Sequence, residues 1–571
     1  MIHDYASRLN DFRAILKKQR LDAYIIPNSD AWQSENPEPY DRRLNYICGL
    51  DASAGYVVIT SNTACVMIDG RYTLSAKTQI DERLFDIVYY TDILPEQWAI
   101  DNAKDNAVIG YDPWLFTKAE AKRMQKTCNL HGVTLMAMRD NLTDIIWNDQ
   151  PSPIAQKAIA HDLKYVGQSI DDKLKSVCEA VTQNEADSVI ISADDSIAWL
   201  LNLRTIEDTQ TPGIKGFAIL QCDRKKFTVF TDVDCTNIDT KQTKIFEIDF
   251  LSLSELPMAI AHFEREEQIV QISDQSPDWF TEHLNAPASI IIEKTDPCVM
   301  LKACKNTIEQ DGIRTSHLRD AIAVKNTIKW AKNTKSITEI YVGNKLFEER
   351  QKLDLFRGVS FDSIAGFNAN GAKIHGNPTN TIIEGNGLLL IDSGGQYDDG
   401  TTDITRTIAI GKPNKNMREK YTLVLKAHIA LATAIFPEGT TGAQLDAITR
   451  APLWNAGIDF AHGTGHGVGF FLNVHEGPCS ISPKSIVALR EGMLLSNEPG
   501  YYQEGAFGIR LENLMLVQIY KDIDATGNLT GKRLLHFETV TKVPFDEDCI
   551  VREILSEKEL NWLDSYQKKS Q

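Results

Sequence analysis

The sequence lacks long apolar runs, and its cysteines are few and scattered. No apolar stretch approaches the roughly 18 residues of a membrane-spanning helix, and runs such as Gly387–Ile391 have the length of a single strand. None of the ten cysteines forms a Cys-x-x-Cys pair, and the two nearest are Cys298 and Cys304. The first residues, Met1–Arg8, include an acid and no apolar core of a secretory signal. We therefore expect no membrane partner, no disulfide framework, no zinc knuckle and a reducing, cytoplasmic location.

Clusters of positive charge are also missing. Lys and Arg number 60 against 78 Asp and Glu, which gives a formal net charge of −18. The short basic run within Asp223–Lys226 is typical of a solvated turn. Because binding of polyanions requires a basic surface, we expect no nucleic-acid partner.

Three common catalytic signatures are absent from the sequence. It contains no P-loop Gly-Lys-Ser/Thr, no His-Glu-x-x-His helix and no Gly-x-Ser-x-Gly elbow. The glycine-rich stretch Gly463–Gly469 lacks the Gly-x-Gly-x-x-Gly spacing of a dinucleotide-binding loop. These absences disfavour nucleotide binding and serine-nucleophile chemistry, so carboxylates and histidines remain as candidate catalytic groups.

What is present is an alternation of helical and strand patterns that predicts an α/β (α+β) protein. The opening predicts a helix and two strands at Tyr5–Gln19, Ala23–Ile26 and Gly55–Thr60. A similar order of elements recurs with a helix from Ile170 and strands at Ala186–Ile191 and Gly216–Leu220, which indicates a duplicated domain. Two long helical patterns follow at Met300–Thr334 and Thr338–Leu353. The glycine-rich region beyond Gly366 then holds most of the candidate chemistry.

Two aspartates lie on neighbouring strand patterns of that region. Asp392 is expected to end a buried strand, and Asp403 shares one strand face with Thr405 and Thr407. A two-residue turn at Asp399-Gly400 would offset the two aspartates by about 14 Å along the strands. That is too far for a pair of metal ions about 3.5–4 Å apart. We therefore expect a wider loop over Gly394–Gly400 that brings the two aspartates opposite each other.

Three histidines and two glutamates complete the set of candidates. The glycines around His462 and His466 disfavour a helix, and an extended chain places these two imidazoles about 13 Å apart, so one can be a ligand and the other a substrate contact. His475 adds a third imidazole nearby. Glu498 follows a strand and precedes a Pro-Gly turn, and a strand over Gly508–Val517 is expected to present Arg510 and Glu512 on one face. A buried Glu512 needs either Arg510 or a cation as its partner.

Four carboxylates and one imidazole, each beside Gly or Pro or at a strand end, form a composition suited to two divalent metal ions. At this point the sequence resembles the pita-bread metallopeptidases, which include methionine aminopeptidase, prolidase and aminopeptidase P. It is most similar to the long, three-domain form of aminopeptidase P. The motifs that carry the resemblance are Asn28–Ala31, Ile197–Arg204, Ile391–Arg406, His462–Gly469, Leu472–Pro478 and Asn497–Tyr502. Trp32 stands where that form commonly has a histidine.

The resemblance implies a ligand set and an activity. The metal ligands would be Asp392, Asp403, His466, Glu498 and Glu512, with Asp403 and Glu512 bridging two ions. It further implies catalytic roles for His375, His475 and Glu498 and a proline pocket lined by His462, Tyr502 and Arg510. The expected reaction is hydrolysis of the bond between an N-terminal residue and a penultimate proline in peptides, through a hydroxide that bridges the two metals. Oxygen-rich ligands favour Mn²⁺, with Zn²⁺ or Co²⁺ as alternatives.

The resemblance also implies an architecture: two related N-terminal domains and a pita-bread catalytic domain, which we place at 1–155, 156–300 and 301–571. A homodimer is expected from the family alone. Two alternatives stay open at this stage. A prolidase would cleave only dipeptides, and the three-domain length argues against it. A pita-bread binding module that has lost its metals would lack some of the five ligands, and here all five residue types are present.

Overall fold

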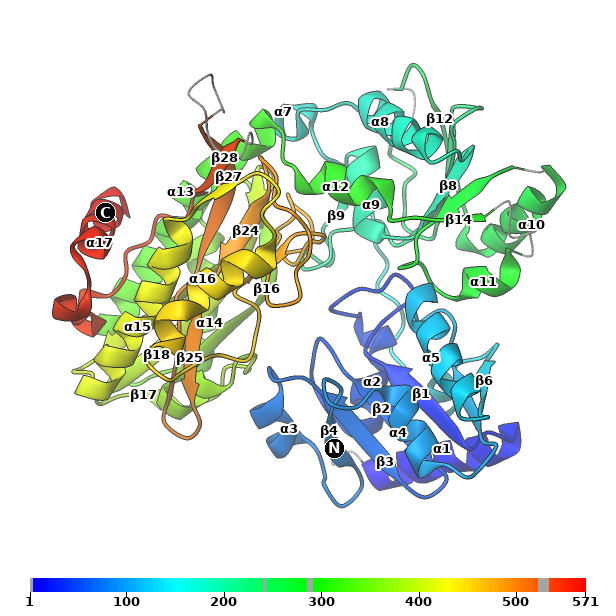
Figure 1. The fold of residues 1–571 in the computed structure, drawn as a ribbon, viewed down its shortest axis with the longest axis horizontal. Coiled ribbons are helices and arrows are strands. Elements are labelled where there is room, and N and C mark those ends of the chain that lie inside the picture. Colours follow the sequence, from blue (N-terminus) through cyan, green and yellow to red (C-terminus); the bar gives the residue numbers. More distant parts are fainter. Residues whose placement is uncertain (1–3, 240–242, 267, 285–290, 522–532, 571) are drawn as a thin grey trace. The chain divides into compact units, whose positions relative to one another are not determined.

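The computed structural model describes residues 4–239, 243–266, 268–284, 291–521 and 533–570, and it divides into two compact units (Figure 1). The first unit comprises Met1–Ala158, Ile170–Leu201 and Ile214–Pro297. The second comprises Ile159–Ser169, Asn202–Gly213 and Cys298–Gln571. The second unit therefore takes two short segments from the middle of the chain in addition to the C-terminal region.

The first unit begins with a six-stranded mixed sheet in the order β4-β3-β2-β1-β5-β6. Its strands are β1 (Ala23–Pro27), β2 (Tyr56–Thr60), β3 (Ala64–Ile68), β4 (Asp86–Tyr89), β5 (Val108–Tyr111) and β6 (Thr134–Ala137). The helices are α1 (Tyr5–Gln19), α2 (Arg43–Cys48), α3 (Thr73–Gln79), α4 (Pro95–Asn102), α5 (Lys118–Leu130) and α6 (Leu142–Ile146). The predictions of a first helix and of strands near residues 23–26 and 55–60 are confirmed.

A second six-stranded sheet in the same unit repeats this plan, in the order β12-β11-β10-β8-β13-β14. Its strands are β8 (Ser188–Ile191), β10 (Gly216–Gln221), β11 (Lys226–Thr231), β12 (Glu247–Leu251), β13 (Val270–Ile272) and β14 (Ile291–Glu293). The helices α8 (Ile170–Gln183), α9 (Asp194–Leu201), α10 (Leu256–Glu266) and α11 (Trp279–His283) accompany it. Both sheets have two antiparallel pairings followed by a parallel edge on one side of the central strand, and two parallel pairings on the other. The predicted duplication is therefore confirmed.

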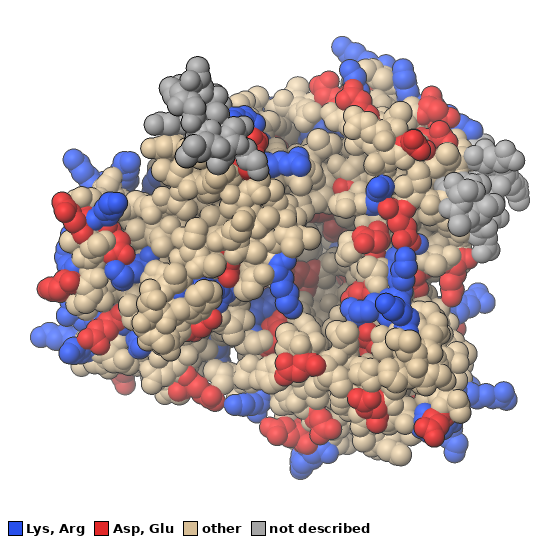
Figure 2. Space-filling model, in the orientation of Figure 1, with Lys and Arg blue, Asp and Glu red and all other residues tan. Residues whose placement is uncertain are grey.

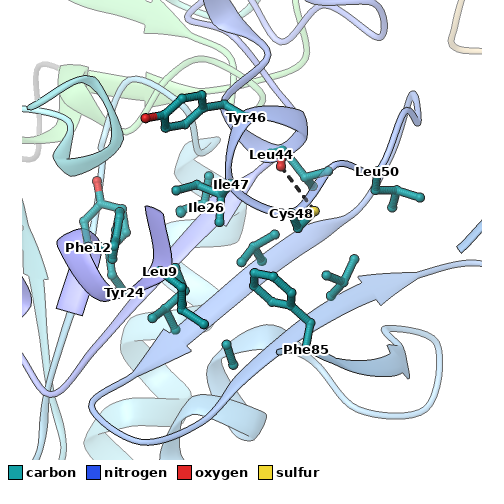
Figure 3. Close-up of a cluster of buried hydrophobic side chains, with 14 of the residues drawn as sticks. Leu9, Phe12, Tyr24, Ile26, Leu44, Tyr46, Ile47, Cys48, Leu50 and Phe85 are labelled. Atoms are coloured by element: carbon teal, nitrogen blue, oxygen red, sulfur yellow. Dashed lines mark hydrogen bonds between the residues drawn. The ribbon is translucent and has the colours of Figure 1, made fainter. Parts of the chain in front are cut away.

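Apolar side chains on one face of the first sheet form a continuous core with α1 and α2 (Figure 3). Phe12 and Leu16 lie one helical turn apart on α1 and pack against Tyr24 and Ile26, which alternate on β1. The Cys48 thiol donates to the Leu44 carbonyl within α2, so this cysteine serves as a buried core residue.

The second unit is built around a long antiparallel sheet. Its central strand β18 (Gly387–Tyr397) pairs with β16 (Phe356–Phe367) on one side and with β19 (Gly400–Thr401) and β20 (Ile404–Ile410) on the other. A second sheet has the order β21-β28-β27-β24, with bounds Ile435–Pro437, Leu534–Thr539, Asn513–Lys521 and Leu494–Asn497. Short pairs join β22 (Gly465–His466) to β23 (Ser480–Ile481), β25 (Gly500–Gln503) to β26 (Phe507–Arg510), and β15 (Ile337–Thr338) to β17 (Ile382–Ile383).

Helices cover both faces of the β16–β20 sheet. Residues of α13 (Thr307–Asn333) and α14 (Glu339–Arg350) pack against Leu389, Ile391, Ile404 and Ile408 on one face. Residues of α15 (Lys415–Ala432) and α16 (Gly442–Trp454), which pack together, and of α17 (Glu557–Ser570) share a core with Leu388 and Ala409 on the other (Figure 1). Strand alternation then places Asp392 on the face of Leu388, away from α13 and α14. The predicted division of Asp403, Thr405 and Thr407 from Ile404 and Ile408 is confirmed.

Four details differ from the predictions. The prediction of a wide loop over Gly394–Gly400 is wrong. Tyr397 pairs with Gly400 across a two-residue turn at Asp398-Asp399. This turn lies one residue earlier than the one considered, so Asp392 pairs with Thr405 and Asp403 lies only two positions further along the same face. Asp392 is also in the middle of its strand rather than at its end.

Two predicted elements are each divided in the structure. The helix expected over Met300–Thr334 is α12 (Pro297–Ala303) followed by α13, because Asn306 caps a new helix by accepting from the Ile308 and Glu309 amides. The strand expected over Gly508–Val517 breaks at Leu511-Glu512, whose amides donate instead to the Pro499 and Thr405 carbonyls. Arg510 and Glu512 consequently belong to different parts of the sheet system.

No helix within the described residues is both long and apolar enough to cross a bilayer. On the face shown in Figure 2, Lys and Arg side chains are interspersed with Asp and Glu.

Candidate metal centre

Three side chains from distant parts of the second unit meet in one cluster. Asp403 lies between β19 and β20, His466 ends β22, and Glu512 lies between β26 and β27. Each offers one ligand atom, and these atoms all lie within 4.8 Å of one another. The strand breaks on either side of Asp403 and Glu512 thus place two buried carboxylates beside an imidazole.

The His466 ring is oriented as a ligand. Its Nδ1 lies 2.9 Å from the carbonyl of Gly467, a contact in which Nδ1–H donates. Nε2 then faces Asp403 Oδ2 at 3.4 Å and Glu498 Oε1 at 3.3 Å, and it is the ring nitrogen that a cation would bind in place of a proton. Burial alone would lower the pKa of His466, but the two carboxylates outweigh it and raise the pKa to about 9.

Glu498 joins the cluster from the end of β24. Its amide donates to the Thr464 carbonyl at 2.8 Å, and Ser496 Oγ donates to its Oε1 at 3.0 Å. Ser496 Oγ also accepts from the His466 amide at 2.9 Å. One hydroxyl therefore fixes the relative positions of two candidate ligands.

Asp392 is held by Arg510. Arg510 Nη2 donates to Asp392 Oδ2 at 2.6 Å. Asp392 Oδ1 is buried and has no hydrogen-bond partner among the described residues. Arg510 therefore partners Asp392 rather than Glu512, and one oxygen of Asp392 remains available as a ligand.

The donor set is chemically suited to cations. Burial, and then the neighbouring carboxylates, raise the pKa of Glu512 well above its usual value. Burial also raises the pKa values of Asp392 and Glu498, against the opposing effects of Arg510 and His466 respectively. Four carboxylates so close together repel one another, and bound divalent cations would remove that repulsion. The residues present therefore fit a metal centre.

The residues expected to contact substrate divide into a connected chain and two further histidines. Arg510 Nη1 donates to Tyr502 Oη at 2.8 Å, and Tyr502 Oη lies 2.9 Å from His462 Nε2. Because His462 Nδ1 contacts the Gly463 carbonyl at 2.7 Å, Nε2 is the acceptor and Tyr502 donates to it. Burial raises the pKa of Tyr502 to about 12, so the phenol stays protonated. His462 therefore contacts Tyr502, whereas His466 contacts Asp403 and Glu498, and the prediction that the two imidazoles do not share one position is confirmed.

His475 and His375 differ in how closely they approach the cluster. The His475 ring lies 4.2 Å from the His466 ring at 85°, edge to face. His375 lies in a turn between the short helix η4 (Asn368–Ala372) and β17, and the carbonyl of the preceding Ile374 accepts from Arg510 Nη1 at 3.4 Å. Both histidines are therefore in segments that contact the site.

Two side chains that hydrogen-bond the candidate ligands were not singled out from the sequence. Thr405 Oγ1 donates to Glu512 Oε2 at 2.7 Å, and Arg510 Nε donates to Thr405 at 3.2 Å. Ser496 was likewise missed. The face shared by Asp403 and Thr405 was a signal for the threonine, whereas nothing in the sequence pointed to the serine.

A cluster of acids and one histidine in a helix-covered antiparallel sheet, joined to two related α/β domains, is the arrangement of a metal-dependent hydrolase with creatinase-like N-terminal domains. Family models match accordingly: the metallopeptidase family M24 over residues 311–518 and its C-terminal region over 533–570. The creatinase/prolidase N-terminal domain matches twice, over 8–140 and 149–309.

Relatives match over nearly the whole chain. A probable Xaa-Pro aminopeptidase P of Laccaria bicolor is 36% identical, over 98% of this chain and 89% of the relative. One from Coccidioides posadasii is 35% identical, over 99% and 95%. The crystal structure of a cytosolic X-prolyl aminopeptidase with a dinuclear active site, from Caenorhabditis elegans, superposes with a TM-score of 0.92 at 29% identity, over 99% and 95%. The chain belongs to the Xaa-Pro aminopeptidase P family of M24 metallopeptidases.

Proposed function

We propose that this metallopeptidase removes the N-terminal residue from peptides whose second residue is proline, with two divalent cations in its active site. The observation that carries the proposal is the convergence of Asp403, His466 and Glu512 within 4.8 Å, flanked by Asp392 and Glu498. The nearly full-length similarity to Xaa-Pro aminopeptidases supports the choice of substrate.

The five side chains would divide between two cations. Asp392 would chelate one ion, His466 and Glu498 would bind the other, and Asp403 and Glu512 would bridge them. Oxygen atoms predominate among these donors, which favours a hard ion such as Mn²⁺, with Zn²⁺ or Co²⁺ as alternatives. Bound cations of this kind supply a nucleophile from water at neutral pH and polarise the scissile carbonyl.

The remaining steps belong to side chains of the protein. Glu498 would accept the proton of the attacking water, a role open to a carboxylate that faces the cluster beside His466 Nε2 at 3.3 Å. His475 donates to the oxygen of the tetrahedral intermediate from its position edge-on to His466. His375 contacts the substrate from the turn whose preceding carbonyl binds Arg510.

A bond before proline requires a dedicated pocket. The proline nitrogen carries no hydrogen, and its ring fixes the backbone, so most peptidases cannot position this bond. Tyr502, His462 and Arg510 form one hydrogen-bonded wall in which every polar atom named above has a partner. Such a wall can receive the apolar proline ring without leaving buried donors exposed to it.

Chain length separates this activity from that of a dipeptidase. The Xaa-Pro dipeptidase of Bacillus anthracis shares the fold, with a TM-score of 0.53, and covers 66% of this chain at 23% identity. The C. elegans aminopeptidase covers 99%. A metal-free binding module is disfavoured because all five ligand types are present and Asp392 keeps an unpartnered buried oxygen within the described part of the chain.

The test combines metal analysis with a substrate panel. The purified protein should contain two divalent ions per chain and should release Arg from Arg-Pro-Pro in the presence of Mn²⁺. Asp403→Asn should lose metal and at least 1,000-fold in kcat while staying folded. Asp399→Asn is a matched control, because Asp399 is also buried but pairs with Arg319. A metal-free protein, or full turnover by Asp403→Asn, would contradict the proposal.

Further properties of the family are proposed for this chain. We infer a cytoplasmic location, which agrees with the buried free thiols of Cys48, Cys65, Cys128, Cys479 and Cys549. We also propose domain boundaries near residues 155 and 300 and a homodimer. Light scattering on the purified protein measures the dimer directly, and a monomer at micromolar concentration would contradict it.

A further inference from the structure

The loop that joins His466 to His475 is anchored at three consecutive backbone carbonyls. We call residues Gly467–Val474 the histidine loop. Its turn is closed by the Gly469 amide, which donates to the Asn473 carbonyl at 3.0 Å. The carbonyls of Phe470, Phe471 and Leu472 between them each accept from a buried side chain.

Two of these carbonyls bind a single arginine. Arg204 Nη2 donates to the Phe470 carbonyl at 2.8 Å, and Arg204 Nε donates to the Phe471 carbonyl. Arg204 Nη1 donates to the Leu203 carbonyl at 2.7 Å. The residue is only 1% exposed. A buried guanidinium is costly to desolvate, and its hydrogen bonds to the carbonyls offset that cost. Any other loop geometry would break these hydrogen bonds and leave a buried charge without partners, so the loop is held in this one.

The loop needs such an anchor because its backbone is strained. Phe471 has φ +47°, the left-handed region that a bulky side chain adopts rarely and at a cost of about 1–3 kcal/mol. The third carbonyl, that of Leu472, accepts from Gln396 Nε2 at 2.8 Å. Gln396 lies on β18, four residues after Asp392, and Thr401 Oγ1 in turn donates to its Oε1 at 2.7 Å. The loop is therefore fastened both to the strand of a candidate ligand and to Arg204.

Arg204 comes from outside the catalytic segment of the sequence. It lies on β9 (Leu203–Thr205), directly after α9, at the end of the Ile197–Arg204 motif. Asn202–Gly213 is one of the two short segments that pack with the C-terminal region. No residue of the Ile197–Arg204 motif takes part in the metal or substrate contacts described above. The burial of Arg204 on the histidine loop therefore needs a separate explanation.

We propose that Arg204 is a positioning residue that sets the catalytic geometry of His475 by clamping the histidine loop. Only Asn473 and Val474 separate the last anchored carbonyl from His475, whose ring stands edge-on to His466 at 4.2 Å. A shift of the strained turn therefore moves this imidazole. The proposal rests on the catalytic role given to His475 in the proposed function.

A double-mutant cycle separates positioning from a merely structural role. Arg204→Met should lower kcat by 10- to 100-fold with KM changed less than threefold and two metal ions retained per chain. In the Arg204→Met/His475→Ala double variant, kcat should be no more than threefold below that of His475→Ala alone. Losses that multiply, or an Arg204→Met variant with full kcat, would overturn the proposal.

Three further measurements test whether Arg204 positions the histidine loop or only stabilises the fold. Amide hydrogen exchange over residues 467–476 should accelerate in Arg204→Met, and unchanged exchange there would overturn the clamp whatever the activities are. Arg204→Lys retains the charge but has one donating nitrogen in place of three, so its kcat should lie between those of the parent and Arg204→Met. If the methionine variant does not fold, the double-mutant cycle is measured with Arg204→Lys instead. Arg43→Met removes another buried arginine, bound to Asp41 and Asp144 in the first unit, and should leave kcat unchanged. If the parent enzyme shows no Xaa-Pro turnover, the proposed function is contradicted. Multiplicative losses in the double variant contradict only the role of Arg204.

Discussion

At the scale of single residues, hydroxyl groups decide how well the carboxylates of the centre are placed. Thr405 donates to Glu512 at 2.7 Å and also accepts from Arg510, so it joins a candidate bridging ligand to the residue that holds Asp392. Metal sites depend on such neighbours because a ligand that can rotate loses part of its binding free energy to ordering.

Thr405→Val should therefore weaken metal binding by 10- to 100-fold, since valine keeps the shape but removes the hydrogen bond. Titration of the metal-depleted protein with Mn²⁺ measures the dissociation constant. Thr449→Val is the control, because the Thr449 hydroxyl is equally buried but donates to the Leu445 carbonyl within α16. Equal affinities in the two variants would contradict this role of Thr405.

A second residue-scale prediction concerns acid stability. His428 is buried in the second unit, with Nδ1 donating to the Leu511 carbonyl at 3.1 Å and Nε2 accepting from Asn513 at 3.0 Å. Burial, assisted by Arg406, lowers its pKa to about 3. The unfolded chain binds a proton near pH 6.5, so the folded state loses stability as the pH falls below that value.

The expected loss is about 2 kcal/mol in the free energy of unfolding between pH 6.5 and 5. Urea unfolding at several pH values measures it. His428→Gln should be less stable at pH 8 but should lose less stability on acidification than the parent does. Parallel pH profiles would show that His428 is not the source of the dependence.

At the scale of elements, a buried ion cluster joins α12 to the segment after the histidine loop. Lys302 Nζ and Lys305 Nζ lie 3.4 Å and 2.5 Å from the two carboxylate oxygens of Glu476. Lys305 also donates to the Lys302 carbonyl, and all three side chains are almost fully buried. Removing one partner from such a cluster leaves the other charges without compensation.

Lys305→Met should therefore destabilise the second unit by about 3–5 kcal/mol. The Lys305→Met/Glu476→Gln double variant should lose less than the sum of the two single changes. Thermal unfolding followed by circular dichroism measures both. Lys415→Met disrupts the exposed Lys415–Glu419 pair of α15 and should change stability by less than about 1 kcal/mol. Additive losses within the buried cluster would contradict this account.

At the scale of the whole molecule, the candidate ligands all belong to the second unit. A cation that binds only the folded form stabilises it by an amount that grows with its concentration. Calorimetry should therefore resolve a transition that rises with Mn²⁺ and falls with a chelator, beside one that does not respond. A uniform response of all transitions would show that the two units unfold as one.

The predictability of the fold differs between the two units. Short strands and amphipathic helices of the first unit follow local patterns, so Tyr5–Gln19 and the strand near residues 23–26 were placed closely. The duplicated sheet order also followed from the recurring pattern. In the second unit, a turn shifted by one residue changed the register around Asp403, and nothing local distinguishes the Asp398-Asp399 turn from its neighbour.

The candidate site was predictable in its residue types but not in its contacts. The five proposed ligands stand out because each acid or imidazole lies at a pattern boundary beside Gly or Pro or on a strand. That Arg510 binds Asp392 rather than Glu512, and that Ser496 joins His466 to Glu498, depends on strands that are far apart along the chain.

The sequence by itself determined the α/β class, the duplication and the donor chemistry, because hydrophobic periodicity and side-chain type are local properties. Only the tertiary structure decided which donors share one cluster, where the strands break and how Arg204 reaches the histidine loop. Those features arise from backbone amides that leave one ladder for another and from buried groups that must find partners across the fold.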